Sequence, residues 1–559
     1  MTSLSGLLHD IGKFYQRTGI SVNLDKYIKY LVYRNNKLTY WHAAYSGLFI
    51  EKYLINNKKL ISMCASHHKE ATIIRKADRL AAAHDRRDSE YDNIFGVTNK
   101  IDNDFITTRL YLIFNEIKIK NINIPYQVPL SCNNEYKYPV RETTIDLDEA
   151  LSQYSNLFTK FIIDIEKINK KNINSLYHYL YPILLNYLIT IPANTYQTLM
   201  PTVSLFDHSK LTAAIANCLN DSNKDFIILK YHLHGISEFV YQGDFKFFKA
   251  RSFYIQIINE LITYAIINRF SLGYENIIYS LGGQGRILLP NNKNSIKILK
   301  KINSEINKEI NLTHKGIINF VLSYDIYSEE DIKAGRFYHN LNKDEKHILK
   351  EKNNIKNYLE KKIKYDMIEK LMSKSDIILE YSFSNNNENI LLDFNSLGKI
   401  CYFEKIHNNA FYQSYNCYKI GDVKYFPYSK PIILGNKRLA LILMNIKNLG
   451  IIFASGIDKN AQSISKLLTL SRCLERFFAY EVKKILEKFS VYILYSGSDD
   501  IVLISNPDDS EMIVKTIQES FARYTGYNKS FQFNHVIMVF FKEELRTVYY
   551  KAKRKLKRR

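Results

Sequence analysis

Histidine and aspartate residues recur near the amino end of the chain in an order that could bind metal. They form two adjacent pairs and two single positions: His9–Asp10, His42, His67–His68 and Asp78. Neutral imidazoles combined with carboxylates suit transition metals such as Mn, Ni or Fe better than Ca or Mg. An ion of this kind lowers the pKa of a bound water and holds a phosphate oxygen. The residues therefore predict a metal site capable of phosphodiester hydrolysis.

An adjacent His–Asp pair taken alone is a weak indication of such a site, because these residues also cap helices and cover surfaces. Their recurrence within the first 80 residues is more specific and favours the metal site. A second pair, His84–Asp85, follows the others and is interpreted as structural. Nearby arginines either bind phosphate or form a solvated basic face; they are Arg79, Arg86 and Arg87.

A second group of acids lies in a sharp turn near the carboxyl end. An apolar run ends at Tyr495, and SGSDD follows it before a second apolar run, IVLI. Ser, Gly and Asp are common in turns for conformational reasons alone, so an ordinary hairpin is one interpretation. Successive acids at the tip, Asp499 and Asp500, repel each other unless a cation lies beside them. Polymerase and nucleotidyl cyclase palm domains hold divalent metal over a triphosphate in this way, and both interpretations stay open here.

Helices are expected to position the first group, and alternating strands and helices the second. From Thr2 to about Asn99 apolar residues recur at spacings of three and four, which predicts one all-helical unit. From Asp225 the order is a strand (DFIILKYHL), a helix (RSFYIQIINELITYAII) and a hairpin (NIIYSLGGQGRILLP). The same order returns from Arg438 and ends in the SGSDD hairpin, which suggests an internal duplication. A helix, a strand and a basic helix follow.

Two other stretches are less regular. Residues 100–200 mix short strand-like and helical runs, and their assignment stays open. Between about 291 and 380, helix-length runs rich in Lys, Asn, Ile and Glu predict a solvated helical insertion. The NNNEN run at 385–389 predicts a loop or linker.

The composition excludes several classes of protein. The length of 559 residues predicts about three to four domains. Lys and Arg outnumber Asp and Glu by 78 to 56, a formal charge of +22 that attracts phosphate polymers. The six cysteines include no C-x-x-C pair, which argues against a zinc ribbon or a disulfide framework. No apolar run suits a membrane span or a signal peptide, so we expect a cytoplasmic protein that does not engage a membrane.

Segments from both ends of the chain resemble one known family. In this order, LLHDIGKFYQR, HAAYSG, SHH, ADRLAA, HGISEFVY, KARSFYIQII, YSLGGQGRILLP, NLGIIFASG, SKLLTLSRCLERFF, YSGSDD and ARYTGYN look like the large subunit of type III-A CRISPR effector complexes, the Csm-type "CRISPR polymerase". The resemblance covers most of the chain. It implies an HD domain that degrades single-stranded DNA. It also implies two palm domains that bind a pair of ATP molecules and join them into cyclic oligoadenylate when target RNA is bound.

The resemblance implies roles for individual residues. It matches the HD metal ligands, the first two of them catalytic, to His9, Asp10, His42, His67 and Asp78. It matches the catalytic, metal-binding acids of the family's GGDD signature to Asp499 and Asp500. It matches the nucleotide-binding positions to Gly282, Gly283, Gly497 and Ser498. The implied cofactors are Mn, Ni or a similar ion at the HD site, Mg or Mn at an active palm, and ATP. The implied partners are guide crRNA, target RNA, single-stranded DNA and the other type III-A subunits.

The sequence departs from the family pattern in the palms. Ser498 stands at a signature glycine, and NIKNLG at 445–450 stands where the family reads D-x-D-N-L-G. Carboxylates are lost from that strand and Lys447 lies beside it, so affinity for metal should fall. His232 replaces an acid common in the first palm. The zinc cysteines between the palms and a C-terminal helical domain are missing, and the basic end KAKRKLKRR either binds guide RNA or is a solvated helix end.

The sequence therefore predicts an α+β multidomain protein, with an all-α HD domain followed by two ferredoxin-like palm domains separated by a helical insertion. The expected boundaries are 1–99 for the HD domain, 100–220 for a connecting region, 221–330 for the first palm, 331–435 for the linker or insertion and 436–559 for the second palm. The predicted function is that of the large subunit of an RNA-guided antiviral effector. It combines a metal-dependent single-strand deoxyribonuclease with a weakened or inactive cyclase. A non-catalytic assembly platform is the alternative, and a free-standing HD phosphohydrolase is disfavoured because it would not need the palms.

Overall fold

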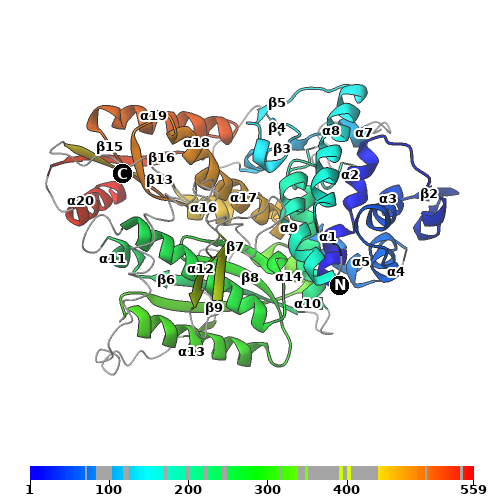
Figure 1. Ribbon diagram of the computed structural model, residues 1–559, viewed down its shortest axis with the longest axis horizontal. Coiled ribbons are helices and arrows are strands. Elements are labelled where there is room, and N and C mark those ends of the chain that lie inside the picture. The colour runs from blue at the N-terminus through cyan, green and yellow to red at the C-terminus, as the bar shows by residue number, and fades with distance from the viewer. Residues whose placement is uncertain are drawn as a thin grey trace.

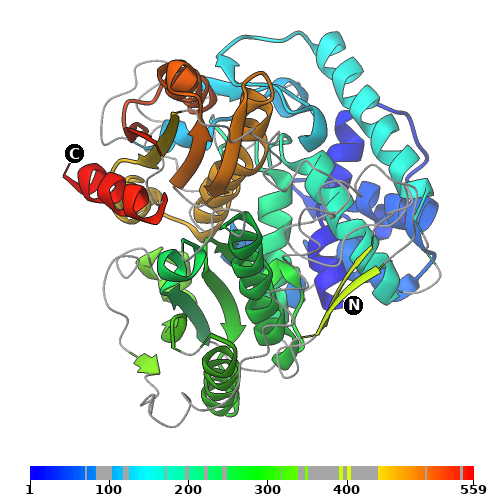
Figure 2. The same ribbon diagram turned by 60° about the vertical axis from the view of Figure 1, so that its left-hand side comes forward.

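The computed structural model is a mixed α+β structure in which helices and sheets occupy different regions. In Figure 1 the amino-terminal helices lie at one end of the molecule, and two sheets with their covering helices lie at the other, one above the other. Figure 2 shows the two sheet units facing each other across their boundary. The residues described are 1–69, 72–82, 104–117, 125–168, 170, 173–195, 200–219, 225–241, 248–314, 316–337, 347–349, 389–393, 399–403, 438–497, 500–541 and 545–558.

Short helices built from the apolar pattern form the amino-terminal part. Side chains at three- and four-residue spacing, among them Leu4, Leu7, Leu8, Ile11 and Phe14, are fully buried and make its core. A π-helical turn over residues 50–54 continues the third helix. The helices are α1 (Thr2–Leu8), α2 (Ile11–Arg17), α3 (Trp41–Phe49), α4 (Lys58–Ala65) and α5 (Ile73–Ala81).

The prediction that this part is all-helical is wrong at one place. β1 (Val32–Arg34) and β2 (Lys37–Thr39) pair as an antiparallel hairpin. The residues that join them, Asn35 and Asn36, adopt φ angles of 47° and 60°. A two-residue hairpin turn requires positive φ at both positions, and asparagine tolerates it better than most residues. The Asn-Asn pair therefore carried information that a search for helical spacing does not use.

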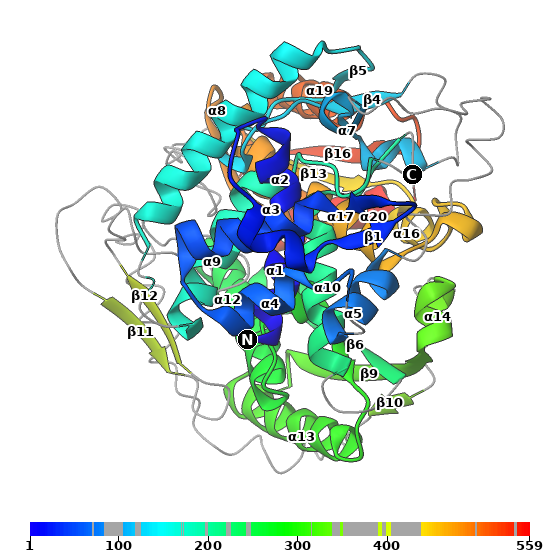
Figure 3. The same ribbon diagram turned by 90° about the vertical axis from the view of Figure 1, so that its right-hand side faces the viewer.

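One helix of the connecting region lies at the centre of the molecule. α10 (Leu205–Leu219) is buried along almost its entire length and contacts α1 and α5 on one side and the first sheet on the other. Figure 3 shows it beside those two helices. The remaining elements of the region are α7 (Asp104–Thr107), α8 (Leu147–Glu166), α9 (Ile173–Leu188) and a small sheet of β3 (Leu110–Tyr111), β4 (Tyr126–Val128) and β5 (Val140–Arg141).

The first large sheet has the strand order β10-β9-β6-β8-β7 and is antiparallel between neighbours. Along the chain its elements run strand, helix, strand, strand, helix, strand before β10 is added at the edge. They are β6 (Asp225–His234), α11 (Ile236–Val240), α12 (Phe248–Arg269), β7 (Ile277–Leu281), β8 (Gln284–Pro290), α13 (Ser295–His314), β9 (Asn319–Ser328), α14 (Glu329–Lys333) and β10 (His347–Leu349).

The second large sheet repeats that order. Its strands lie as β14-β15-β13-β16, which is the arrangement of the first sheet without its extra edge strand. The predicted recurrence of strand, helix and hairpin is therefore found in the structure. The elements are β13 (Leu439–Ile446), α16 (Leu449–Ser455), α17 (Ile464–Arg476), α18 (Val482–Leu486), β14 (Val491–Gly497), β15 (Asp500–Ser505), α19 (Pro507–Tyr524), β16 (Phe533–Phe540) and α20 (Leu545–Lys557).

The predicted solvated helical insertion is wrong in its first part. α13 and β9 belong to the first sheet unit, and the Lys- and Asn-rich helix buries Leu299, Ile302, Ile306 and Ile310 against it. Its polar composition reflects the solvent face only. Further along, the described residues include three strands, β10, β11 (Asn389–Asp393) and β12 (Lys399–Phe403), so the segment is not purely helical. Most of NNNEN lies outside the described residues.

Within the described residues, every helix is too short or too polar to cross a membrane. Cys64, Cys132, Cys218 and Cys473 are free and buried. They behave as small apolar core residues.

Candidate metal centre

His9 and Asp10 lie at a break between two helices. α1 ends at Leu8, and Asp10 adopts φ −106° and ψ 7°, outside the helical range, before α2 begins. On a continuous helix neighbouring side chains diverge by about 100°. The break removes this divergence, and both side chains point into the protein, with exposures of 0% and 2%.

Close packing of α2 against α3 brings His42 to this break. A Cβ on Gly12 would lie 1.9 Å from the carbonyl oxygen of His42 and 2.5 Å from the backbone nitrogen of Ser46. The backbone N–H of Gly12 donates to the hydroxyl of Ser46 (2.9 Å), which donates to the carbonyl of His9 (2.8 Å). Any side chain at position 12 would collide with the backbone of α3. Glycine at this position therefore allows α2 and α3 to pack closely.

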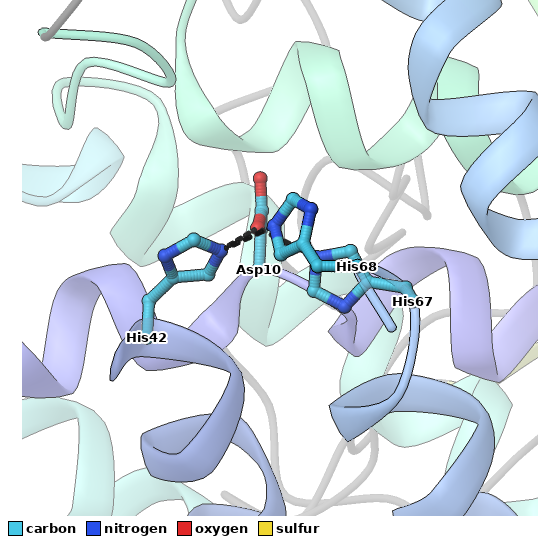
Figure 4. A group of neighbouring side chains, drawn as sticks. All are labelled: Asp10, His42, His67 and His68. Carbon is cyan, nitrogen blue, oxygen red and sulfur yellow. Dashed lines mark hydrogen bonds and ion pairs between the residues drawn. The ribbon is translucent and has the colours of Figure 1, made fainter. Parts of the chain in front are cut away.

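The ligand atoms form two sets that share Asp10, one of which is drawn in Figure 4. The sets are Asp10, His42, His67 and His68, and His9, Asp10, Asp78 and His208; within each set the ligand atoms lie within 4.8 Å of one another. Asp10 Oδ1 lies 3.4 Å from Nε2 of His42 and 3.7 Å from Nε2 of His67. Asp10 Oδ2 lies 3.4 Å from Nε2 of His9 and 3.5 Å from Nε2 of His208. The two oxygens of one carboxylate thus face different sets.

Backbone carbonyls orient two of the histidines for metal binding. Nδ1 of His9 donates to the carbonyl of Gly6 (2.8 Å), and Nδ1 of His67 donates to the carbonyl of Cys64 (2.5 Å). Each bond leaves the Nε2 lone pair directed into the site. Nε2 of His9, Nε2 of His67 and Oδ1 of Asp10 are buried and have no hydrogen-bond partner among the described residues. Buried polar atoms are normally satisfied, and a cation would satisfy these three.

The spacing of the solvent-facing histidines also fits an ion. Nε2 of His42 lies 2.9 Å from Nε2 of His68. Two nitrogen ligands bound to one ion at about 2.1 Å each, and at a right angle, lie about 3.0 Å apart. His208 completes the other set from α10, with its Nε2 3.1 Å from Oδ1 of Asp78. The residues present therefore fit one divalent ion on each side of Asp10.

Electrostatics in the site favour a bound cation. Burial alone would lower the pKa of His9, but Asp10 and Asp78 beside it raise that pKa to about 10. Burial alone would raise the pKa of Asp10, yet Lys13 and His9 hold it well below its usual range. Burial and neighbouring His9 lower the pKa of His67 to about 4, so that imidazole is neutral. The carboxylates of Asp10 and Asp78 thus stabilise a positive charge at His9, and a metal ion on Nε2 would supply that charge in place of the proton.

The structure brings together five residues that the sequence predicted as ligands: His9, Asp10, His42, His67 and Asp78. It also includes His68, which the sequence offered as a candidate together with His67, and it adds His208, which was missed. His208 belongs to α10, in the region whose assignment was left open, and reaches the site only through packing of that helix on α1 and α5. The sequence signal that could have indicated His208 is its position next to Asp207, which makes another adjacent pair of these residue types. His84, Asp85, Arg86 and Arg87 lie outside the described residues, and Arg79 is exposed on α5.

A cavity of about 500 Å³ lies between the two large sheets. Its lining includes both turn glycines of the first sheet, polar and charged residues of the second, and Lys553 of α20. The lining residues include His232, His234, Gly282, Gly283, Arg472, Glu475, Gly497 and Asp500. Ser498 and Asp499, predicted to bind nucleotide and metal, lie outside the described residues.

The glycines of the first sheet form the turn between β7 and β8. Gly282 and Gly283 adopt φ angles of 59° and 81°, which side chains rarely tolerate. A Cβ on Gly283 would lie 2.2 Å from Ile236 of α11. The carbonyl of Gly283 accepts a hydrogen bond from the backbone N–H of Leu233 (2.7 Å). The turn therefore presents bare backbone to the cavity.

The second sheet lacks an acid where the sequence comparison predicted its loss. Asp500 begins β15 and pairs with Asn445 of β13 and with Gly497 of β14. The strand beside Asp500 thus offers an amide where the family pattern has a carboxylate, and the nearby Lys447 is exposed.

α10 connects the cavity with the metal centre. His208 on this helix faces Asp10, whereas Asp207 forms a buried pair with Arg472 of α17, which lines the cavity. Nη2 of Arg472 lies 2.7 Å from Oδ2 of Asp207, and Thr469 of α17 donates to the same oxygen (2.9 Å). Adjacent residues of one helix therefore belong to the two sites.

Known proteins are similar to this chain in sequence. Residues 438–559 match the family model for the second palm domain of Cas10/Cmr2, and residues 225–374 match that for Csm1 subunit domain B. A relative from Enterococcus italicus, the CRISPR system single-strand-specific deoxyribonuclease Cas10/Csm1 (subtype III-A), is 25% identical over 94% of this chain and 80% of its own length. Over most of its length the chain is similar to Cas10/Csm1 proteins. A Methanocaldococcus jannaschii relative of the same name is 23% identical over 94% of this chain and 84% of its own length. The resemblance inferred from the sequence motifs is confirmed.

Solved Cas10/Csm1 structures share the fold. Csm1 of T. onnurineus superposes with a TM-score of 0.70 at 18% identity, covering 100% of this chain and 81% of that one. A Csm1–Csm4 cassette in complex with cA4 has a TM-score of 0.66 at 16% identity, with coverage of 100% and 81%. A cassette in complex with AMPPNP has a TM-score of 0.66 at 17% identity, with coverage of 100% and 82%.

Proposed function

We propose that this protein is the large subunit of a type III-A CRISPR effector complex and that its amino-terminal helices form an HD-type, metal-dependent nuclease acting on single-stranded DNA. The observation that carries the nuclease proposal is the pair of ligand sets on either side of Asp10. The names of the relatives, which describe single-strand-specific deoxyribonucleases, support the choice of substrate. The boundaries proposed for this domain are those of the bundle together with α10, because His208 completes the site.

Divalent ions bound in the two sets would supply the Lewis acidity that activates a water and neutralises phosphate charge. Asp10 would serve both sets through separate oxygens. Imidazole and carboxylate donors favour Mn, Ni or a similar ion. Lys13 orients Asp10, since its Nζ lies 2.5 Å from Oδ2 of that residue and 2.9 Å from the carbonyl of Ala193. Its side chain is 17% exposed, so it also places a cation where a phosphate would enter.

For the two sheets we propose ferredoxin-like palm domains that bind ATP in the cavity between them. The equivalent strand orders, the bare turn at Gly282 and Gly283, and the basic residues Arg472 and Lys553 support this assignment. Asp499 and Asp500, with Gly497 and Ser498 beside them, would hold Mg or Mn. Since Asn445 replaces an acid beside Asp500, we propose a cyclic oligoadenylate synthase that is weakened or inactive.

The proposed partners follow from charge and family. A formal charge of +22 suits binding of guide crRNA, target RNA and single-stranded DNA. Solved relatives are described in complex with Csm4, which supports association with other type III-A subunits. The cytoplasm is the proposed location, as for other RNA-guided effectors.

Cleavage of single-stranded DNA tests the nuclease proposal. The assembled complex is incubated with Mn²⁺, labelled DNA and target RNA, comparing wild type, His9→Ala/Asp10→Ala, and Glu519→Gln as an exposed control. We expect cleavage by wild type and Glu519→Gln, and none by the double variant. Equal behaviour of wild type and double variant would remove the nuclease from this site.

Mass spectrometry of the products formed from ATP tests the palms. A weakened synthase gives traces of cyclic oligoadenylate that vanish in Asp500→Asn, while an inactive one gives none. A non-catalytic platform predicts that complexes carrying substitutions at both sites assemble normally and that the wild type lacks both activities. Strong oligoadenylate synthesis would contradict the effect assigned to Asn445.

A further inference from the structure

Among the described histidines of the metal centre, solvent reaches His42 and His68 more than the others. His9 and His208 have side chains exposed by 0% and 5%, whereas the side chain of His42 is exposed by 14% and His68 is half-buried. The accessible histidines His42 and His68 therefore mark one approach by which a polymeric substrate would reach Asp10. The elements around this opening are the β1–β2 hairpin and the start of α3, which follows the hairpin directly.

A continuous stack of side chains leads from solvent to these ligands. The ring of Tyr40 stacks on that of His68, with centroids 3.9 Å apart and an angle of 21° between the planes. The guanidinium of Arg34, an exposed residue of β1, lies 5.1 Å from the centre of the Tyr40 ring. Arg34 is thereby held beside the opening by a cation–π contact. A basic group thus stands at the entrance, two side chains away from the proposed ions.

Tyr40 holds an unusual backbone conformation to make this stack. Its φ of 65° and ψ of 43° lie in the left-handed region, which is uncommon for a bulky residue. Such conformations persist where surrounding structure enforces them, and they concentrate at functional sites. The bend at Tyr40 ends the hairpin and starts α3, so it directs Trp41 outward while His42 points inward.

Trp41, which stands between Tyr40 and His42 in the sequence, exposes a large aromatic side chain. It is the single tryptophan of the chain and is 39% exposed, although tryptophan is usually well buried. Two exposed basic residues of the hairpin, Arg34 and Lys37, precede it in sequence. Aromatic faces combined with basic side chains are the means by which proteins bind single-stranded nucleic acid without regard to sequence.

We propose that the β1–β2 hairpin and the start of α3 form the binding site for single-stranded DNA, in which a nucleobase stacks on Trp41 and Arg34 contacts the adjoining phosphate. The inference rests on the proposed nuclease, and it adds the residues that hold the strand. Positive charge favours a polyanion over an apolar protein partner as the occupant. Tyr40 acts as a positioning residue, since it holds Arg34 and His68 together.

The fluorescence of Trp41 reports this contact without cleavage. The purified full-length chain is titrated with an unlabelled deoxyribonucleotide oligomer in the presence of EDTA. We expect saturable quenching, weakened by added salt and weakened roughly tenfold by Arg34→Ala. Absence of any fluorescence change in a chain that cleaves the same oligomer with Mn²⁺ would overturn the proposal. Quenching without any cleavage would instead overturn the proposed nuclease and leave the binding site standing.

Kinetics of the assembled complex provide the second measurement. Trp41→Ala should raise KM for single-stranded DNA by about 5- to 150-fold, the usual range for loss of one stacked base, with little change in kcat. Trp41→Phe should restore most of the affinity. Tyr527→Ala is the matched control, because Tyr527 is 55% exposed on the loop after α19, away from the opening. An unchanged KM in Trp41→Ala would overturn the proposal. Loss of subunit assembly in this variant would also overturn it, because Trp41 would then belong to an interface with another protein.

Discussion

The Asp207→Asn substitution tests the contact between α10 and α17. Asp207 accepts hydrogen bonds from Nε of Arg472 to Oδ1 (2.9 Å) and from Nη2 of Arg472 to Oδ2 (2.7 Å). Ser204 donates to Oδ2 at 2.7 Å and Thr469 at 2.9 Å. The side chain of Asp207 is 2% exposed and that of Arg472 is 14% exposed. Water therefore cannot readily solvate the guanidinium of Arg472 once the negative charge of Asp207 is removed.

The structure sets the size of the effect. Removing one member of a buried ion pair costs about 3–5 kcal/mol, because the remaining charge stays desolvated. Asparagine keeps one oxygen for the hydroxyl donors, so we expect the lower end, about 3 kcal/mol. With a denaturant dependence of about 2 kcal/mol per molar urea, the unfolding midpoint should fall by about 1.5 M.

Urea unfolding of the purified chain, followed by circular dichroism, provides the assay. Glu519→Gln is the control, because Glu519 is 65% exposed and lies 3.9 Å from Lys515. Exposed pairs of this kind contribute about 0.5 kcal/mol or less. Equal midpoints for the two variants would refute the reasoning. Because His208 follows Asp207 on α10, calorimetry should also show weaker Mn²⁺ binding by Asp207→Asn.

Other substitutions test the close approaches and the buried charges. Gly12→Ala should weaken Mn²⁺ binding roughly tenfold or more, because its Cβ would push the backbone of His42 away; an unchanged calorimetric titration would contradict this. Gly283→Ala, at φ 81°, should lower the free energy of unfolding by about 1–3 kcal/mol in urea and weaken ATP binding; an unaltered midpoint would count against the turn's strain. Burial, opposed by Lys210, raises the pKa of Glu475 to about 7 from 4.5. The folded state therefore keeps this proton to higher pH, and stability from this group falls as pH rises between those values. Glu475→Gln should be more stabilising, relative to wild type, at pH 8 than at pH 5, and an equal difference in urea midpoint would exclude the shift.

Local pattern predicted much of the fold and of the site. The two strand–helix–hairpin units were visible because continuous apolar strands and amphipathic helices leave strong signals within each segment. His9, Asp10 and Asp78 were found because their types and order are distinctive inside a short stretch. The break at Asp10, which lets adjacent side chains serve one site, is a backbone feature that residue spacing does not express.

The features that the sequence did not predict depend mainly on contacts between segments that are distant in the chain. His208 joins Asp10 and Asp78 only because α10 packs on α1 and α5, and no local spacing relates it to them. α13 was interpreted as solvated because Lys and Asn dominate its composition, although its apolar stripe packs on the first sheet. The hairpin at 32–39 depends on two asparagines with positive φ, a signal two residues long.

Anomalous diffraction at the manganese edge, from crystals of the protein grown with Mn²⁺, tests the central claim most directly. The account predicts two peaks, one among His42, His67 and His68 and one among His9, Asp78 and His208, with Asp10 between them. Crystals of Asp10→Ala should lose both. Manganese bound elsewhere, or no peak beside Asp10 in the wild type, would contradict the assignment of a metal centre to these residues.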